Sequence, residues 1–176
     1  MRAEQNVKRF LVLLLVLAPG TALAATQVDI DTLAESIRST GTKIVESNTC
    51  EKGFQGYYQF EDKKIDQLTV CANNIDMKDP DQVWEVYAHE VTHIVQACDK
   101  AEGGRAFSDS YFPRIYRELQ QLNPSSVEDT SLYGSWDKRQ EIEARYMELL
   151  PPKDVIEFFH GSLCFEQQQQ PQSTSR

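Results

Sequence analysis

One segment constrains the fold of this chain more than any other, the stretch DPDQVWEVYAHEVTHIVQAC at residues 79–98. Asp79 stands at a helix N-cap, Pro80 suits the first helical position, and Gln82 is placed to complete a capping box. Apolar side chains recur at spacings of three, four and seven residues, which places them on one stripe: Val83, Tyr87, Val91, Ile94, Val95 and Cys98. We therefore predict a long amphipathic helix that buries this stripe.

Two of the three histidines in the chain project from the opposite side of this predicted helix. His89 and His93 are four residues apart, and each residue rotates by about 100° around the helix, so Val91 lies opposite both. Histidines at this spacing can converge on one Zn²⁺ at roughly 2.0–2.1 Å. Glu90 would stand beside the metal as a general base towards a bound water. The motif is short, and two surface histidines on a helix remain the alternative reading.

A second segment, EIEARYMELLPP at residues 141–152, is predicted to be a helix that stops at its two prolines. It resembles the glutamate helix of gluzincins, in which Glu-x-x-Ala-Asp carries the third zinc ligand at its first position. The resemblance implies that Glu141 is the zinc ligand and that Ala144 lets two helices approach. The order of elements over residues 53–156 is also similar to the small gluzincins of the ImmA/IrrE group.

Other ligands stay open because the match is incomplete. Arg145 stands where these families have Asp or Asn to orient a metal histidine. Glu143, about 200° around the helix from the first glutamate of the motif, is the alternative ligand. Gln96 and Asp99 occupy the positions at which metzincins have a glycine and a third ligand, so only half of that pattern is present. Asp129 corresponds loosely to the downstream aspartate of aspzincins.

The resemblance implies a zinc metallopeptidase that hydrolyses peptide bonds of a peptide or protein substrate, and the N-terminal residues described below predict that it is exported. One Zn²⁺ would be held by His89, His93 and Glu141, and a zinc-bound water would be activated by Glu90. The competing interpretation is a non-catalytic zincin-like module that binds a metal or a partner. A closed site with four protein ligands would favour that interpretation.

The resemblance also implies two further features of a peptidase site. The strand at residues 67–73 would pair with the substrate backbone. A histidine or tyrosine would stabilise the oxyanion, and His160, Tyr133 and Tyr116 are the candidates. His160 can equally be a helix C-terminal residue that interacts with the helix dipole.

Around the long helix we predict a single α+β domain over residues 25–166. An N-terminal helix begins near Asp31 and includes Ile44 and Val45, and a β-hairpin turns at residues 61–64. Further helices follow near Pro113, over 136–150 and up to Gly161, with a loop over 128–135. The fold class is therefore zincin-like α+β, with several helices and a small antiparallel sheet.

The two ends of the chain are predicted to lie outside this domain. Residues 1–24 have the basic start, apolar run and Ala-x-Ala end of a secretory signal peptide, and the run is too short to span a membrane. We therefore expect a secreted or periplasmic protein without a stable membrane anchor. Residues 167–176 are a Gln-rich segment typical of disorder. The net charge of −9 argues against a nucleic-acid partner.

Four cysteines in an exported chain predict two disulfides, with three possible pairings. A hairpin that turns at 61–64 brings Cys50 near the end of the strand that carries Cys71. Cys98 lies at the far end of a helix about 27 Å long, away from the strand. This geometry favours Cys50–Cys71 and Cys98–Cys164.

Overall fold

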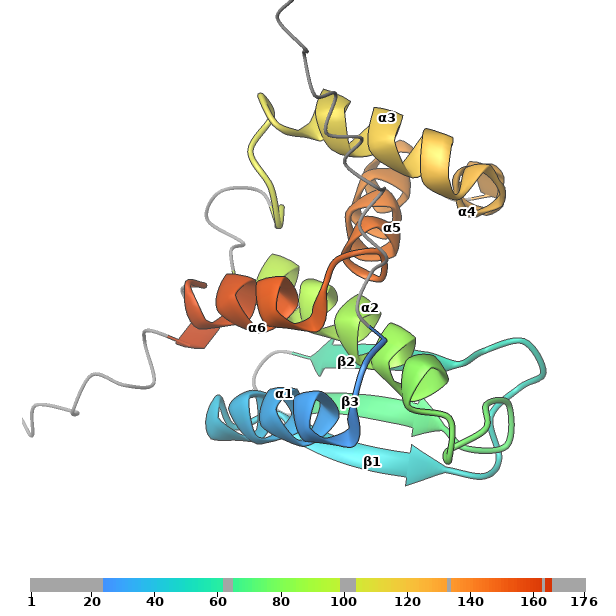
Figure 1. The fold of residues 1–176 in the computed structure, drawn as a ribbon, viewed down its shortest axis with the longest axis vertical. Helices are drawn as coiled ribbons and strands as arrows, with labels where there is room; N and C mark the ends of the chain where they lie inside the picture. The colour runs from blue at the N-terminus through green and yellow to red at the C-terminus, as the bar shows by residue number, and fades with distance from the viewer. Residues whose placement is uncertain (1–23, 62–64, 99–103, 133, 163, 166–176) are drawn as a thin grey trace, which may run out of the picture.

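The computed structural model describes residues 24–61, 65–98, 104–132, 134–162 and 164–165. The predicted signal peptide, apart from its last residue, and the Gln-rich tail lie outside these residues. In chain order the elements are α1 (Gln27–Ser39), β1 (Lys43–Ser47), β2 (Gly56–Glu61), β3 (Ile65–Cys71), α2 (Pro80–Cys98), α3 (Phe112–Leu122), α4 (Pro124–Asp129), the 3₁₀ turn η2 (Thr130–Leu132), α5 (Ser135–Met147) and α6 (Pro152–His160). This α+β architecture confirms the predicted fold class (Figure 1).

The sheet contains the predicted hairpin and one strand that was not predicted. Its order is β1-β3-β2, with β2 antiparallel to β3 and β1 parallel to β3. Ile44 and Val45, expected in the N-terminal helix, belong to β1. The helix ends earlier because Gly41 adopts a φ of 94°, a left-handed conformation that favours glycine and terminates helices. The β-branched residues that follow then suit a strand.

Two helix boundaries also differ from the prediction. α1 starts at Gln27, because Thr26 and Asp29 form a capping box upstream of Asp31. The segment 128–135, expected to be a loop, contains the end of α4 and the turn η2. Asn123 caps α4 by accepting a hydrogen bond from the Ser126 backbone N–H.

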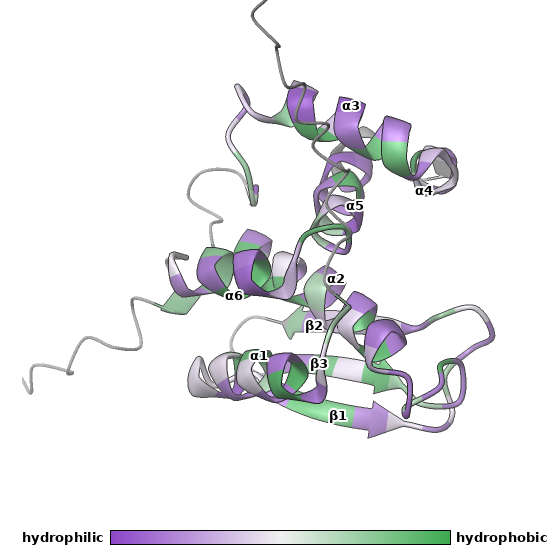
Figure 2. Ribbon diagram, in the orientation of Figure 1, coloured by the Kyte–Doolittle hydropathy of each residue, from purple (hydrophilic) through white to green (hydrophobic). Residues whose placement is uncertain are grey.

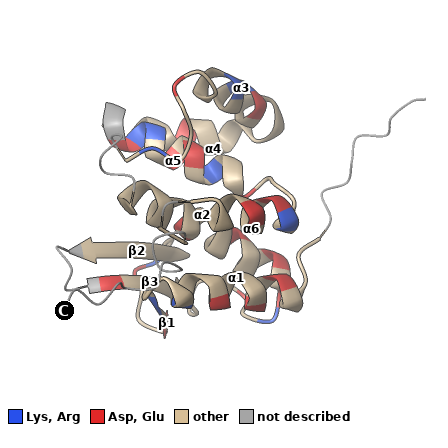
Figure 3. Cartoon of the chain, turned by 90° about the vertical axis from the view of Figure 1, so that its left-hand side faces the viewer, with Lys and Arg blue, Asp and Glu red and all other residues tan. Residues whose placement is uncertain are grey.

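The molecule is layered, with α2 in the middle. α1 and α2 pack on one face of the sheet, and α6 packs against both helices (Figures 1 and 3). On its other side α2 contacts α5, which in turn supports α3 and α4. A main core joins α1, α2, α6 and β3, and a smaller core joins α3, α4 and α5. The alternation of hydrophobic and hydrophilic residues around α1 and α3 is visible in Figure 2.

Both favoured disulfides are present. Cys50 bonds to Cys71 and Cys98 bonds to Cys164, each pair with Cα atoms 5.7 Å apart. The first ties the segment before β2 to the end of β3, and the second ties the end of α2 to the segment after α6. Within the described part of the chain, no helix is long and apolar enough to cross a membrane.

Candidate metal centre

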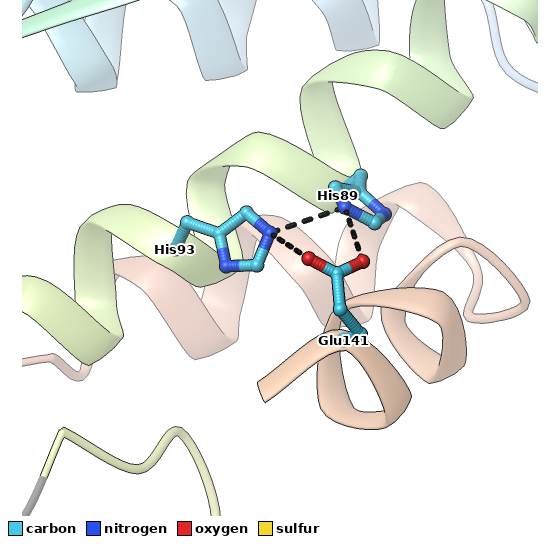
Figure 4. A group of neighbouring side chains, drawn as sticks. All are labelled: His89, His93 and Glu141. Atoms are coloured by element: carbon cyan, nitrogen blue, oxygen red, sulfur yellow. Dashed lines mark hydrogen bonds and ion pairs between the residues drawn. The ribbon is translucent and has the colours of Figure 1, made fainter. Parts of the chain in front are cut away.

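Three side chains from two packed helices converge on one point (Figure 4). α2 contributes His89 and His93, whose Nε2 atoms are 3.1 Å apart. α5 contributes Glu141, whose carboxylate oxygens lie 3.5 Å from the Nε2 atom of His89 and 3.4 Å from that of His93. The i, i+4 spacing brings the histidines together, and the packing of α5 on α2 adds the glutamate.

These spacings fit a metal ion. Ligands of a tetrahedral zinc at roughly 2.0–2.1 Å from the ion lie about 3.3 Å from one another. The three donor atoms of this group all lie within 4.8 Å of one another, and the distances above are close to the ideal value. A His-His-Glu donor set is also one that catalytic zinc sites use. The residues present therefore fit one metal ion, and the structure brings together the three predicted ligands.

His89 is oriented by a carboxylate from the end of α5. Its Nδ1–H donates to Oε1 of Glu148 over 2.7 Å, and Arg145 donates to the same oxygen over 3.0 Å. Burial lowers the pKa of His89, but its hydrogen bonds to Glu141 and Glu148 outweigh burial and raise the pKa to about 10. Glu148 therefore orients the His89 ring, and Arg145 holds Glu148 in place.

The partner that orients His93 is an amide. The Nδ1 atom of His93 lies 2.8 Å from Oε1 of Gln96, a residue that is 2% exposed. The Nε2 group of Gln96 donates to the Gln140 backbone carbonyl and to Glu143, each over 3.1 Å. Each histidine thus has one ring nitrogen towards the metal point and the other towards a polar partner.

Glu143, the alternative ligand, is placed elsewhere. Its side chain is fully buried and faces the interior between α2, α5 and the segment before α3. Its oxygens accept hydrogen bonds from Arg139 over 2.9 Å and from the Ala106 backbone N–H over 2.8 Å. The metal point receives Glu141 instead, because the two glutamates point to different sides of α5.

Glu90 is buried next to the metal point. Its side chain is 4% exposed, and its Oε2 atom has no hydrogen-bond partner among the described residues. Burial raises the pKa of Glu90, whereas positive charge on His89 and His93 would lower it. For Glu141, burial raises the pKa, but His89 and His93 in their protonated forms lower it well below its usual range. An unpaired buried carboxylate oxygen beside a group of side chains that could hold a metal ion is typical of functional sites.

The group lies in a cleft of about 460 Å³, a size usual for small-ligand and peptide sites. α2 forms the floor, α5 forms one wall, and the start of β2 with its preceding loop forms the other. The lining residues are Gly53, Phe54, Gln55, Gly56, Tyr57, Tyr58, Glu85, Val86, His89, Glu90, His93, Glu141, Arg145 and Glu148.

Gly56 lets β2 approach the floor closely. A Cβ atom at this position would lie 2.5 Å from Cγ1 of Val86 and 3.4 Å from Oε1 of Glu90. Any side chain there would therefore push β2 away from α2. The sequence reading missed this role, although an isolated glycine at the start of a strand is a signal of close approach.

The prediction that the strand at residues 67–73 pairs with the substrate backbone is wrong. Residues 67–73 include most of β3, which is the middle strand and pairs on both sides. Within the described residues β2 pairs with β3 alone, so β2 is an edge strand, as β1 is, and the first half of β2 lines the cleft. The error arises because a hairpin pattern does not show on which side a third strand will add.

The other predicted site residues lie away from the cleft or outside the described residues. His160 lies 2.8 Å from the Ser36 hydroxyl and stacks on Phe165 with ring centroids 4.3 Å apart. Asp129 ends α4 and does not line the cleft. Tyr133 and Asp99 fall outside the described residues.

Comparison of the chain with protein-family models, with curated proteins and with solved structures finds no match. The geometry of the chain is therefore the basis for its functional interpretation.

Proposed function

We propose that this chain is an exported zinc metallopeptidase of the gluzincin type. The observation that carries the proposal is the juxtaposition of three metal-ligand side chains with Glu90, a buried carboxylate that keeps one oxygen unpaired. His89, His93 and Glu141 would hold one Zn²⁺. No fourth described His, Cys, Asp or Glu belongs to the group, which is the ligand count of a catalytic rather than a structural zinc site.

The bound Zn²⁺ would polarise a substrate carbonyl and lower the pKa of water at the site. Glu90 would accept the proton of the attacking water and later donate it to the leaving amine. Its raised pKa brings the carboxylate closer to the range in which it can both take and return a proton. Glu148 and Gln96 would hold the two histidines in place during these steps.

The shape of the cleft supports a peptide substrate. β2 presents an open edge beside the ligand group, and an extended peptide can add to such an edge by backbone hydrogen bonds. Three aromatic residues, Phe54, Tyr57 and Tyr58, belong to the same wall, so apolar surface of this wall would contact substrate side chains.

Export is part of the proposal. Two disulfides suit an oxidising compartment such as the periplasm or the extracellular space. They accompany a predicted signal peptide at residues 1–24 and a predicted absence of any stable anchor after its removal.

The test compares the zinc-loaded wild type with Glu90→Gln on a library of quenched-fluorescent peptides. We expect the variant to retain stoichiometric zinc and to lose about 10²–10⁴-fold in kcat, as for removal of a general base. Glu35→Gln, on the exposed side of α1, is the matched control and should hydrolyse like the wild type. Unaltered hydrolysis in Glu90→Gln would rule out the mechanism.

A non-catalytic metal-binding module is the second candidate. One observation favours it: His160 and Tyr116, the predicted oxyanion donors within the described residues, do not line the cleft. The same experiment separates the two functions. Tight zinc binding with no hydrolysis of any library peptide by the wild type would support the binding module.

A further inference from the structure

Glu143 is a fully buried carboxylate that the proposed reaction does not use. A buried carboxylate is costly unless it is paired and hydrogen-bonded. Glu143 meets this condition with three donors: Arg139, the backbone N–H of Ala106 and the amide of Gln96. The Oε2 atom of Glu143 accepts from the backbone N–H of Ala106, and the same oxygen is the acceptor that faces Gln96.

That acceptor determines which way the Gln96 amide points. The oxygen and nitrogen of an amide have nearly the same shape, so hydrogen-bond partners decide the orientation. One end of the Gln96 amide faces Oε2 of Glu143 and the Gln140 backbone carbonyl, each at 3.1 Å. Both are acceptors, so this end must be the NH₂ group. The Oε1 atom of Gln96 therefore points to His93.

An amide oxygen can only accept a hydrogen bond. The Nδ1 atom of His93, 2.8 Å from Oε1 of Gln96, must then carry the proton. In the neutral ring this leaves the lone pair on Nε2, the atom that points at Glu141 and His89. Nε2 with its lone pair is the form in which a neutral histidine binds a metal.

We propose that Gln96 and Glu143 are positioning residues: Glu143 orients Gln96, and Gln96 fixes His93 in the tautomer whose Nε2 is free for the metal. This inference rests on the proposed metal site. It gives Glu143, which the sequence left open as an alternative ligand, a defined task two steps from the ion.

A control variant must separate the proposed positioning role of Gln96 and Glu143 from a purely structural role of the same residues. Gln140 and Arg139 both connect α5 to the segment before α3, through the carbonyls of Gly104 and Phe107. Gln140→Ala removes the bond to Gly104 but keeps the backbone carbonyl that Gln96 uses, and it does not touch His93. This variant therefore weakens the contact of α5 with the segment before α3 without changing the tautomer of His93.

The most direct test needs neither metal nor activity. Nitrogen NMR of the ¹⁵N-histidine-labelled, metal-free protein, at a pH where the His93 ring is neutral, reports which ring nitrogen carries the proton. We expect a protonated Nδ1 and a non-protonated Nε2 in the wild type. A neutral His93 ring protonated on Nε2 would overturn the proposal, whether or not the protein binds zinc.

The second test is zinc affinity, measured by competition with a chromophoric chelator. Gln96→Leu should weaken zinc binding by about 10- to 100-fold, the range for loss of an outer partner of a ligand. Glu143→Gln should weaken it in the same direction, and Gln140→Ala should leave it close to the wild type. An unchanged affinity in Gln96→Leu, or an equal loss in Gln140→Ala, would refute the positioning role.

The outcomes are separable from failure of the proposed function. If the wild type binds no zinc, the metallopeptidase proposal fails, and the tautomer measurement still decides what Gln96 does. If Gln96→Leu does not fold, the wild-type NMR spectrum decides the question without a variant.

Discussion

The two walls of the cleft differ in what they offer. The wall from β2 and its preceding loop is lined by two glycines, one glutamine and three aromatic residues, and it contains no charged residue. The opposite wall, from α5 and the residue that caps it, consists of Glu141, Arg145 and Glu148. α5 carries acidic and basic residues together (Figure 3).

This difference separates two tasks. In the proposed function the charged wall would supply one ligand and the carboxylate that orients a second, so its residues should set metal affinity. The neutral wall supplies an open strand edge and apolar surface, so its residues should set substrate affinity. A variant on one wall should therefore change its own property and leave the other property intact.

The largest effect is expected from the charged wall. Glu141→Ala removes a ligand and should weaken zinc binding by more than about 100-fold, beyond the range for outer partners. The measurement is chelator competition, with Glu157→Ala on the exposed side of α6 as the control. Wild-type zinc affinity in Glu141→Ala would mean that a different residue completes the site.

The neutral wall is anchored by the disulfide at Cys50, which closes a sequence separation of 21 residues. Replacing Cys50 and Cys71 by serine together should lower the free energy of unfolding by about 3 kcal/mol, mainly through the entropy of the unfolded chain. Denaturant unfolding measures this change. Zinc affinity should stay near that of the wild type, and a matching loss of zinc would show that the two walls are not independent.

Gly56→Ala tests the close contact between β2 and α2. The added Cβ would approach Cγ1 of Val86 to 2.5 Å, so β2 must shift, at a cost of about 1–3 kcal/mol for overpacking. We expect a raised KM for peptides and unchanged zinc affinity. Gly134→Ala is the control, because its Cβ would meet only Asp137 at 3.7 Å. An unchanged KM would show that β2 does not bind the substrate.

The site was predictable wherever it depends on local spacing. His89, Glu90 and His93 follow from positions along one helix, whereas Glu141 was indicated by the resemblance of its segment to the gluzincin glutamate helix, with Glu143 left as the alternative. Glu148 and Gln96 were not predictable, because they reach the histidines only through the way α5 crosses α2. A hydrogen bond that depends on how two helices pack cannot be predicted from the sequence of either helix alone.

The same reason explains the errors in the sheet. The β-hairpin could be predicted because its two strands are adjacent in sequence and because apolar and polar residues alternate along them. β1 is only five residues long and pairs in parallel with β3, a contact between segments that are not neighbours along the chain. Without β1 the hairpin has two free edges, and the wrong strand was chosen for the substrate.

The smallest effect is expected at Arg145, which touches the metal centre only through Glu148. Its side chain is 33% exposed, so solvent weakens the ion pair. Arg145→Gln should weaken zinc binding by at most about 10-fold, the low end for outer partners, and Arg145→Lys should lie between this variant and the wild type. A loss as large as that of Glu141→Ala would place Arg145 closer to the metal than the structure does.

The central claim is that three residues on α2 and α5 hold a zinc ion with one position left for chemistry. A crystal structure of the zinc-loaded protein, with the ion located by anomalous scattering, tests it most directly. The account predicts one zinc at roughly 2.0–2.1 Å from the Nε2 atoms of His89 and His93 and a carboxylate oxygen of Glu141, without a fourth protein ligand. Zinc at another site, or with four protein ligands, would contradict it.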